Sequence, residues 1–361
     1  MILNKVNKMK LFTVGPVEMY PDTLKIEGTQ QPYFRTPEFS GVMLEIERCF
    51  MKSVFAANDA HFICLTCSGT GAMEASVVNV LNENDKVLVI NGGSFGNRFK
   101  QICTLHDIPN EEYHIAYGDA FNKNEFEKFN NQGFTALLVN VSETSTTQKY
   151  DLDYLGDFCR RNGMILIVDA VSAYLADPIY MEKQGIDVLL TASQKALSLA
   201  PGLALVAISD RVYKSRVMTN KKKSYYFDFV DYVENQHRGQ PPFTSAVGTV
   251  LSLCQRLKDI DTRGVEDEWA IHKKRADYFR EKIKALPVSL PDFEMSNSCT
   301  AVLFDGIEAS KIYENLKEKY EIILTPSGGN IKDRQLRVGH LGNLTLEDYD
   351  YLIVKMKEEF V

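Results

Sequence analysis

Residues 165–171 read Ile-Leu-Ile-Val-Asp-Ala-Val, and residues 191–197 read Thr-Ala-Ser-Gln-Lys-Ala-Leu. The first stretch is an unbroken apolar run that ends in a carboxylate, Asp169. Such a run is typical of a strand buried on both faces, as the strands of parallel sheets are. The second stretch follows the next apolar run, 188–190, and places the amine of Lys195 just beyond it. The two stretches therefore predict an acid and an amine at neighbouring strand ends.

Similar apolar runs recur along the first two thirds of the chain, separated by amphipathic stretches. We predict strands at 61–65, 86–90, 136–141, 164–168, 188–190 and 203–208. We predict helices between them at 71–81, 95–105 and 152–161. This alternation predicts an α/β fold with a mostly parallel sheet flanked by helices, which binds its ligands at the carboxyl ends of the strands.

The pattern changes near residue 247. Two long helical stretches, 247–257 and 269–286, come first. Shorter strands at 300–304, 322–325 and 335–338 then alternate with helices at 310–319 and 346–359. The 361 residues suit two domains. We therefore expect an N-terminal arm (1–14), a large domain (15–246) and a small C-terminal α+β domain (247–361).

The composition is that of an ordinary globular enzyme, with 45% hydrophobic and 25% charged residues. A net charge of −7 argues against broad binding to nucleic-acid phosphates. No stretch reaches the roughly 20 apolar residues of a membrane span, and the N-terminus lacks the apolar core of a signal peptide. We expect a cytoplasmic protein whose partners include neither nucleic acid nor a membrane.

The seven cysteines are odd in number and lack the dense spacing of a disulfide scaffold. Cys64 and Cys67 form a C-x-x-C pair, which is found in redox sites and as half of a zinc site. No second pair accompanies it, and 61–65 has the pattern of a strand. We interpret both as buried thiols and expect no metal site.

Residues 67–74, Cys-Ser-Gly-Thr-Gly-Ala-Met-Glu, lie between a predicted strand and a predicted helix. Glycines at such a turn let backbone N–H groups approach an anion, and the helix dipole attracts it. Glu74 stands where a dinucleotide fingerprint requires a third glycine, and the Lys-Ser/Thr of a Walker A loop is missing. A phosphate cradle and a plain tight turn both fit this segment alone.

Taken together, the three strand ends offer a phosphate cradle, a carboxylate and an amine. Pyridoxal 5'-phosphate needs these three groups: a place for its phosphate, an acid that keeps its ring nitrogen protonated, and a lysine for its aldehyde. The combination predicts a pyridoxal-phosphate site with Lys195 and Asp169 as its catalytic residues.

From Phe12 onward the chain resembles the class V (fold type I) pyridoxal-phosphate aminotransferases, in the group of the alanine:glyoxylate, serine:pyruvate and 2-aminoethylphosphonate:pyruvate enzymes. The matching segments are TVGP (13–16), SGTGA (68–72), NGGSFG (91–96), ETST (143–146), VDAVS (168–172), QGID (184–187), SQKAL (193–197), FTS (243–245) and LRVG (336–339). The resemblance implies the fold type I architecture, with a seven-stranded sheet in the large domain.

The resemblance also implies roles for individual residues. Lys195 would bond to the aldehyde and Asp169 would bind the ring nitrogen. The other cofactor contacts implied are Ser68, Gly69, Thr70 and Gly71 around the phosphate, Phe95 stacked on the ring, Thr144 near the ring hydroxyl, Val171 under the ring and Gln194 beside the phosphate or hydroxyl. Thr244 would reach the phosphate of a neighbouring subunit, which implies a homodimer with shared sites. Arg337 would grip the substrate carboxylate, and the backbone of Gly15 would approach the substrate.

The implied reaction moves an amino group from a small donor of alanine, serine or 2-aminoethylphosphonate type to a 2-oxo acid such as pyruvate or glyoxylate, with ping-pong kinetics. The donor stays open. Pro241 and Pro242 replace the Arg that precedes Phe-Thr-Ser in the phosphonate enzymes and the Tyr expected there in the alanine:glyoxylate enzymes. Arg35 could bind a second acidic group or contact another subunit.

Two other functions remain as alternatives. Cysteine desulfurases share the fold but carry His before the lysine and His on the ring, where this chain has Gln194 and Phe95. A non-catalytic pyridoxal-phosphate sensor would normally carry a DNA-binding segment outside the aminotransferase region, and we expect none here.

Overall fold

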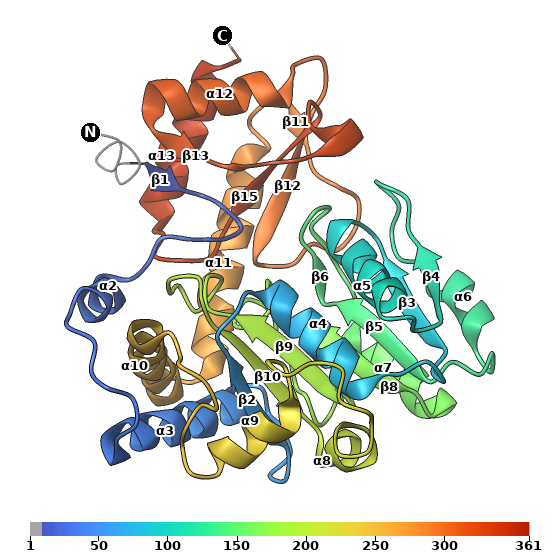
Figure 1. The fold of residues 1–361 in the computed structure, drawn as a ribbon. Coiled ribbons are helices and arrows are strands. Elements are labelled where there is room, and N and C mark those ends of the chain that lie inside the picture. Colours follow the sequence, from blue (N-terminus) through green and yellow to red (C-terminus); the bar gives the residue numbers. More distant parts are fainter. Residues whose placement is uncertain (1–8, 361) are drawn as a thin grey trace.

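The computed structural model describes residues 9–360, apart from the side chain of Asn330. Residues 1–8, which make up most of the expected N-terminal arm, lie outside the described residues, as does Val361. Figure 1 shows a large domain built around a sheet and a smaller domain at one end of it. The long helix α11 (Val265–Ile283) runs from one to the other (Figure 1).

The large domain contains the predicted seven-stranded sheet. In spatial order its strands are β2 (His61–Leu65), β10 (Ala204–Ile208), β9 (Val188–Ala192), β8 (Ile165–Asp169), β5 (Ala136–Asn140), β3 (Val87–Asn91) and β4 (Asn110–His114). The pairs from β9 to β4 are all parallel. The predicted fold class is therefore confirmed, and six of the seven strands lie where the apolar runs are.

Two details of the sheet differ from the prediction. Strand β4 was missed, because its sequence Asn-Glu-Glu-Tyr-His is polar and the strand lies at the edge, paired only with β3. Strand β10 was grouped with the parallel strands but runs antiparallel to both neighbours. An unbroken apolar run reports burial on both faces of a sheet, and it carries no information about strand direction.

Helices cover both faces of the sheet. Residues Val87 and Val89 of β3 face a cluster formed with α4 (Gly69–Val80) and α5 (Ser94–Leu105). The alternate residues Leu88 and Ile90 face a second cluster formed with α3 (Pro37–Ser53) and α7 (Leu152–Asn162). The period of two along each strand thus buries both of its sides.

The shorter elements of the large domain are α2 (Pro21–Glu27), α6 (Lys123–Phe126), η1 (Glu127–Phe129), β6 (Ser142–Glu143), β7 (Gln148–Lys149), α8 (Asp210–Val212), η2 (Tyr213–Val217) and α9 (Phe229–Gln236). The small domain has a four-stranded antiparallel sheet in the order β11 (Val288–Ser289), β12 (Cys299–Phe304), β15 (Gln335–Gly339) and β14 (Thr325–Pro326). Its other elements are α12 (Ala309–Tyr320), β13 (Ile322–Ile323), η3 (Gly329–Ile331) and α13 (Leu346–Glu358).

The first described residues of the chain belong to the small domain. Strand β1 (Lys10–Leu11) pairs with β13, and Phe12 lies in the small domain's apolar core. Helix α10 (Val247–Arg263) packs instead on α3, with its buried residues Val250 and Leu253 in the large domain's core. The division at residues 246 and 247 stays a prediction, and the packing favours a later one, inside α11. Among the described helices, none has the length and apolar character needed to cross a bilayer.

Candidate active site

The site lies where the carboxyl ends of β8 and β9 meet the N-terminal segment of the chain. Asp169 is the last residue of β8 and pairs in register with Leu190 of the neighbouring parallel strand β9. Lys195 follows three residues after β9 ends. Both side chains are almost fully buried, with 6% and 8% exposure. The two residues predicted at neighbouring strand ends are therefore brought to the same edge of the sheet.

Asp169 is held in place by two donors. Asn140 Nδ2 donates to Oδ2 at 2.9 Å, and the backbone N–H of Val171 donates to Oδ1 at 2.8 Å. Burial nevertheless raises the pKa of this carboxyl to about 6, because desolvation disfavours the anion. A cation beside Asp169, such as a protonated ring nitrogen, would relieve that cost.

Lys195 is a desolvated amine. Burial lowers its pKa to about 8, so that a substantial fraction is neutral near physiological pH. Its Nζ donates a hydrogen bond of 2.6 Å to the carbonyl of Val14. A neutral amine of this kind can attack an aldehyde and accept a proton.

Gly15 packs directly against this lysine. A Cβ added at Gly15 would lie 2.5 Å from Lys195 Cδ and 2.8 Å from its Nζ, and the backbone there has a φ of +129°. The Thr-Val-Gly-Pro segment at 13–16 therefore sets the position of the amine. This contact crosses from one end of the sequence to the middle of the chain.

Gly15→Ala is expected to displace the Lys195 amine and slow uptake of pyridoxal phosphate by about tenfold or more, since a 1 Å misplacement of a reacting group has effects of this size. Absorbance of the purified protein during incubation with the aldehyde measures the rate. Gly118→Ala is the matched control, because Gly118 also has a positive φ, +92°, but nothing lies within 4 Å of its added Cβ. Equal rates for the two variants would show that the contact does not matter.

The predicted phosphate cradle begins helix α4. Ser68 is its N-cap but makes no capping hydrogen bond with its side chain. Among the described residues, no acceptor is bonded to the N–H groups of Gly69, Thr70 or Gly71. A Cβ at Gly69 would lie 2.8 Å from Val171 Cγ2, so only glycine allows this close approach to the end of β8. The open helix end therefore lies beside Asp169 and can accept an anion.

Gln194 and Val171 lie at the same edge of the sheet. The Oε1 of Gln194 is buried and has no hydrogen-bond partner in the described structure, so an external donor would satisfy it. The orphaned amide, the glycine cradle, the desolvated amine and the buried acid are the features that pyridoxal phosphate requires. The residues present fit that cofactor.

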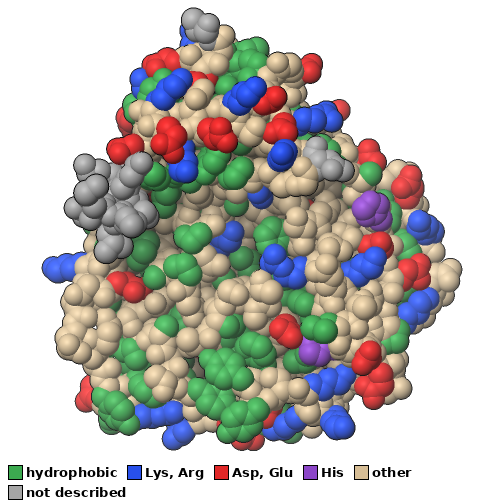
Figure 2. All heavy atoms as spheres, turned by 45° about the horizontal axis from the view of Figure 1, so that its top comes forward, with side chains coloured by type: hydrophobic (Ala, Val, Ile, Leu, Met, Phe, Trp, Pro, Cys, Tyr) green, Lys and Arg blue, Asp and Glu red, His purple; other side chains and the backbone are tan. Residues whose placement is uncertain are grey.

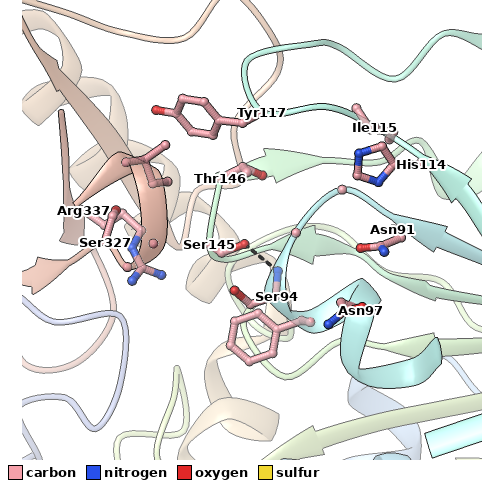
Figure 3. Close-up of a pocket in the computed structure, with 16 residues that line it drawn as sticks. Asn91, Ser94, Asn97, His114, Ile115, Tyr117, Ser145, Thr146, Ser327 and Arg337 are labelled. Atoms are coloured by element: carbon pink, nitrogen blue, oxygen red, sulfur yellow. Dashed lines mark hydrogen bonds between the residues drawn. The ribbon is translucent and has the colours of Figure 1, made fainter. Parts of the chain in front are cut away.

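Glu143 fixes the start of α5, where Phe95 lies. Its buried carboxylate accepts hydrogen bonds from the N–H groups of Phe95 at 3.2 Å, Gly96 at 2.9 Å and Ser145 at 3.2 Å. Ser145 Oγ in turn accepts from the N–H of Ser94 at 3.0 Å (Figure 3). An acid at a helix N-terminus satisfies its free N–H groups and interacts favourably with the dipole. The half-buried Phe95 ring is thus held by a rigid backbone.

Arg337 reaches the site from the small domain. Its Nη1 donates to the carbonyl of Thr144 at 2.9 Å and its Nη2 to the carbonyl of Pro326 at 2.8 Å. Its Nε is buried without a partner, and no carboxylate of the described residues lies within ion-pair distance. Burial lowers the pKa of this guanidinium. A half-buried arginine with no anion beside it among the described residues is suited to bind a carboxylate from outside.

A cavity of about 680 Å³ opens between the two domains, beside the Lys195 site. Its lining residues include Phe95 and Arg337. Figure 3 shows Arg337 across the cavity from Asn91 and His114. Lys195 itself does not line it. The face in Figure 2 is hollowed below the small domain, and basic side chains lie near its middle.

Three sequence expectations fall outside this cluster. Thr244 is exposed, beyond the groups that surround Lys195. Arg35 donates to the carbonyls of Pro241 at 2.6 Å and Pro242 at 3.0 Å, so its guanidinium holds that loop.

Of the two cysteines expected to be buried thiols, Cys64 is buried but Cys67 is only partly buried.

The cysteines form no disulfide in the described chain. Burial raises the pKa of both Cys64 and Cys67 to about 12, so neither is an activated thiol. Among residues 9–360, no group of three or more His, Cys, Asp or Glu side chains is placed to hold a metal ion.

Sequence reasoning missed three residues near the site. Asn140 and Glu143 act through contacts that span 29 and 47 positions. Glu143 belongs to the matching segment 143–146, but the resemblance gave it no role. Arg98 stands three positions after Phe95 on a helix, and residues at that spacing share a face. That spacing was the one available signal.

Comparisons with known proteins agree with this fold. Residues 39–331 match the family described as Aminotransferase class-V. The chain is 29% identical to the small subunit of the soluble hydrogenase from Synechococcus sp. (strain PCC 6716), over 93% of this chain and 88% of that protein. It is also 29% identical to the alanine–glyoxylate aminotransferase of Callithrix jacchus, over 95% and 86%. The solved structure of an alanine–glyoxylate aminotransferase from Nostoc sp. superposes with a TM-score of 0.91 at 24% identity, over 98% and 95%.

The α/β fold of this chain is thus that of a solved aminotransferase. The family match covers most of the chain, so this protein belongs to the class V aminotransferases and is a transaminase. The resemblance noted from the nine sequence segments is confirmed. The family implies pyridoxal phosphate as cofactor.

Proposed function

We propose that this protein is a pyridoxal-phosphate-dependent aminotransferase that moves an amino group from a small donor, of alanine, serine or 2-aminoethylphosphonate type, to a 2-oxo acid such as pyruvate or glyoxylate. The observation that carries the proposal is the juxtaposition of a desolvated lysine and a buried aspartate at one sheet edge, beside an open helix N-terminus. The alanine–glyoxylate aminotransferases similar to this chain support the substrate class.

The residues divide the work of the reaction. When bound, pyridoxal phosphate supplies an aldehyde that takes up the amino group and a ring that withdraws electrons. Asp169 holds a proton on the ring nitrogen, because an anion there favours the charged ring. Lys195, a fraction of which is neutral because of its lowered pKa, would take the proton from the substrate's α-carbon and deliver it to the carbon that carried the cofactor's aldehyde. Arg337 orients the substrate through its carboxylate, and Phe95 excludes water from one side. Donor and acceptor would occupy the same site in turn, and the first product would leave before the second substrate binds, which gives ping-pong kinetics.

With alanine or serine as the amino donor, Arg337→Lys is expected to raise KM for both the donor and the 2-oxo acid by about ten- to a hundredfold, with a smaller effect on kcat. A lysine keeps the charge but loses the paired hydrogen bonds that a guanidinium makes with a carboxylate. Steady-state kinetics with each substrate varied in turn measure the effect. Arg334→Lys, three residues earlier in the chain, is the control. A KM that rises for one substrate alone would contradict a shared carboxylate site.

We also propose that the enzyme is a homodimer with shared sites. The ring of Tyr226 stacks on Phe243 at 5.0 Å, and the neighbouring Tyr225 is 88% exposed. Exposed aromatic clusters of this kind mark protein contacts, and this one adjoins the exposed Thr244. Light scattering should give twice the chain mass of 40.9 kDa. The monomer mass across micromolar concentrations would contradict the proposal.

The decisive experiment is a panel of amino donors offered to the enzyme loaded with pyridoxal phosphate. Conversion of the bound cofactor from its aldehyde to its amine form is read from absorbance, and a 2-oxo acid should reverse it. Alanine, serine and 2-aminoethylphosphonate are tested with glyoxylate and pyruvate. Release of sulfide from cysteine would favour a desulfurase instead, and cofactor binding without any turnover would favour a sensor.

A further inference from the structure

Arg98 lies between two of the proposed cofactor contacts. It stands on α5, one turn after Phe95, and its guanidinium carbon lies 4.7 Å from the centroid of the Phe95 ring. Its Nη1 donates to Thr70 Oγ1 at 3.0 Å, across from one helix to the next. Arg98 therefore connects the ring of Phe95 to the first turn of α4.

The charge of Arg98 has no partner among the described residues. In the described part of the chain, no carboxylate lies within ion-pair distance of this guanidinium, and the bond to Thr70 is its one hydrogen bond. Four of its five N–H donors are therefore free. Glu143, the acid at the start of the same helix, is already engaged with backbone N–H groups.

The N-terminus of α4 beside it also lacks an acceptor, as described above for Gly69, Thr70 and Gly71. A phosphate seated on these N–H groups would meet the helix dipole from one side and a free guanidinium from the other. Phosphate oxygens match the fork of an arginine, which forms parallel charge-assisted hydrogen bonds.

We propose that Arg98 is a ligand of the cofactor phosphate, recognising a phosphate monoester together with the backbone amides of Gly69, Thr70 and Gly71. The inference rests on the proposed function and adds a residue to it. Arg98 would neutralise part of the phosphate charge, while Thr70 Oγ1 holds the guanidinium over the cradle and against Phe95.

The test compares the affinity of the cofactor-free protein for pyridoxal phosphate with its affinity for pyridoxal, which lacks the phosphate. Both are measured by absorbance or fluorescence titration, without turnover. In Arg98→Met the preference for the phosphorylated form should fall by about ten- to a hundredfold, the effect of losing charge-assisted hydrogen bonds. Arg98→Lys should lose less, because the charge remains.

Lys100→Met is the matched control. Lys100 lies on the same helix and is also a cation, but its Nζ is paired with Glu112 at 2.9 Å. Its removal should leave the preference unchanged. Thr70→Val gives an independent route if Arg98→Met does not fold, since it removes the anchor of the guanidinium and keeps the cradle's amides. Its effect should be less than additive with that of Arg98→Lys, because both act on one contact.

A preference that stays at the wild-type value in Arg98→Met and in Thr70→Val would overturn the inference. So would a change confined to the KM of an acidic substrate, which would assign Arg98 to the substrate instead. Failure of the wild-type protein to bind pyridoxal phosphate at all would overturn the proposed function itself, a result distinct from either of these.

Discussion

Replacement of Lys195 by alanine is expected to lower kcat for amino transfer by about 10⁴-fold or more. This side chain supplies both the nucleophile for the aldehyde and the base for the α-proton, and positioned proton transfer alone contributes up to about 10⁴-fold. Its environment is tuned for both tasks, because burial lowers its pKa to about 8 and the carbonyl of Val14 fixes its Nζ at 2.6 Å. Single-turnover absorbance with an active amino donor measures the loss.

Two controls separate this loss from a failure to fold. Borohydride reduction of the wild-type protein with pyridoxal phosphate should attach the cofactor to Lys195, as peptide mass spectrometry can show, and to no lysine in the variant. A small primary amine added to Lys195→Ala should restore part of the turnover, since it can enter the space that the side chain leaves. Labelling of another lysine in the wild-type protein would rule out the assigned site.

Asp169→Asn is expected to lower kcat by about 10² to 10³-fold, the usual effect of removing one preorganised electrostatic partner. Asparagine keeps the shape of the side chain and can still accept the N–H of Val171, but it cannot stabilise a positive charge on a ring nitrogen. The variant should still react with the aldehyde through Lys195. The measurement is kcat beside the absorbance of the bound cofactor, and an unchanged kcat would exclude this role for Asp169.

The same variant has a second readout in the cofactor-free protein. Burial raises the folded-state pKa of Asp169 to about 6, above the value of about 3.9 expected on unfolding. Between these two pH values the folded state therefore binds more protons than the unfolded state, so the free energy of unfolding falls as the pH rises. The whole destabilisation by ionised Asp169 is present above about pH 6. At pH values above 6, Asp169→Asn should therefore raise the denaturant concentration at the midpoint of unfolding. Below about pH 4 it should have little effect on that midpoint.

The strands and the chemistry of their ends could be predicted from the sequence because both are local. An apolar run such as 165–168 is typical of a strand that is buried on both faces, and the residue after it lies at the carboxyl end of that strand. The positions of Asp169 and Lys195 could be predicted in this way, and so could the glycine-rich start of α4. Strand β4 was not, since an edge strand with a polar face carries no such periodicity.

The sequence alone determined the α/β class, six strands of the sheet, and the acid, the amine and the glycine-rich helix start at their ends, because each depends on a few neighbouring residues. Only the tertiary structure decided the direction of β10, the contact of Gly15 with Lys195, and the bond of Arg337 to Thr144 across 193 positions. The free guanidinium of Arg98 above Phe95 belongs to the same group. These features depend on the path of the chain between distant segments, and local hydrophobic patterns record burial but not which segments meet.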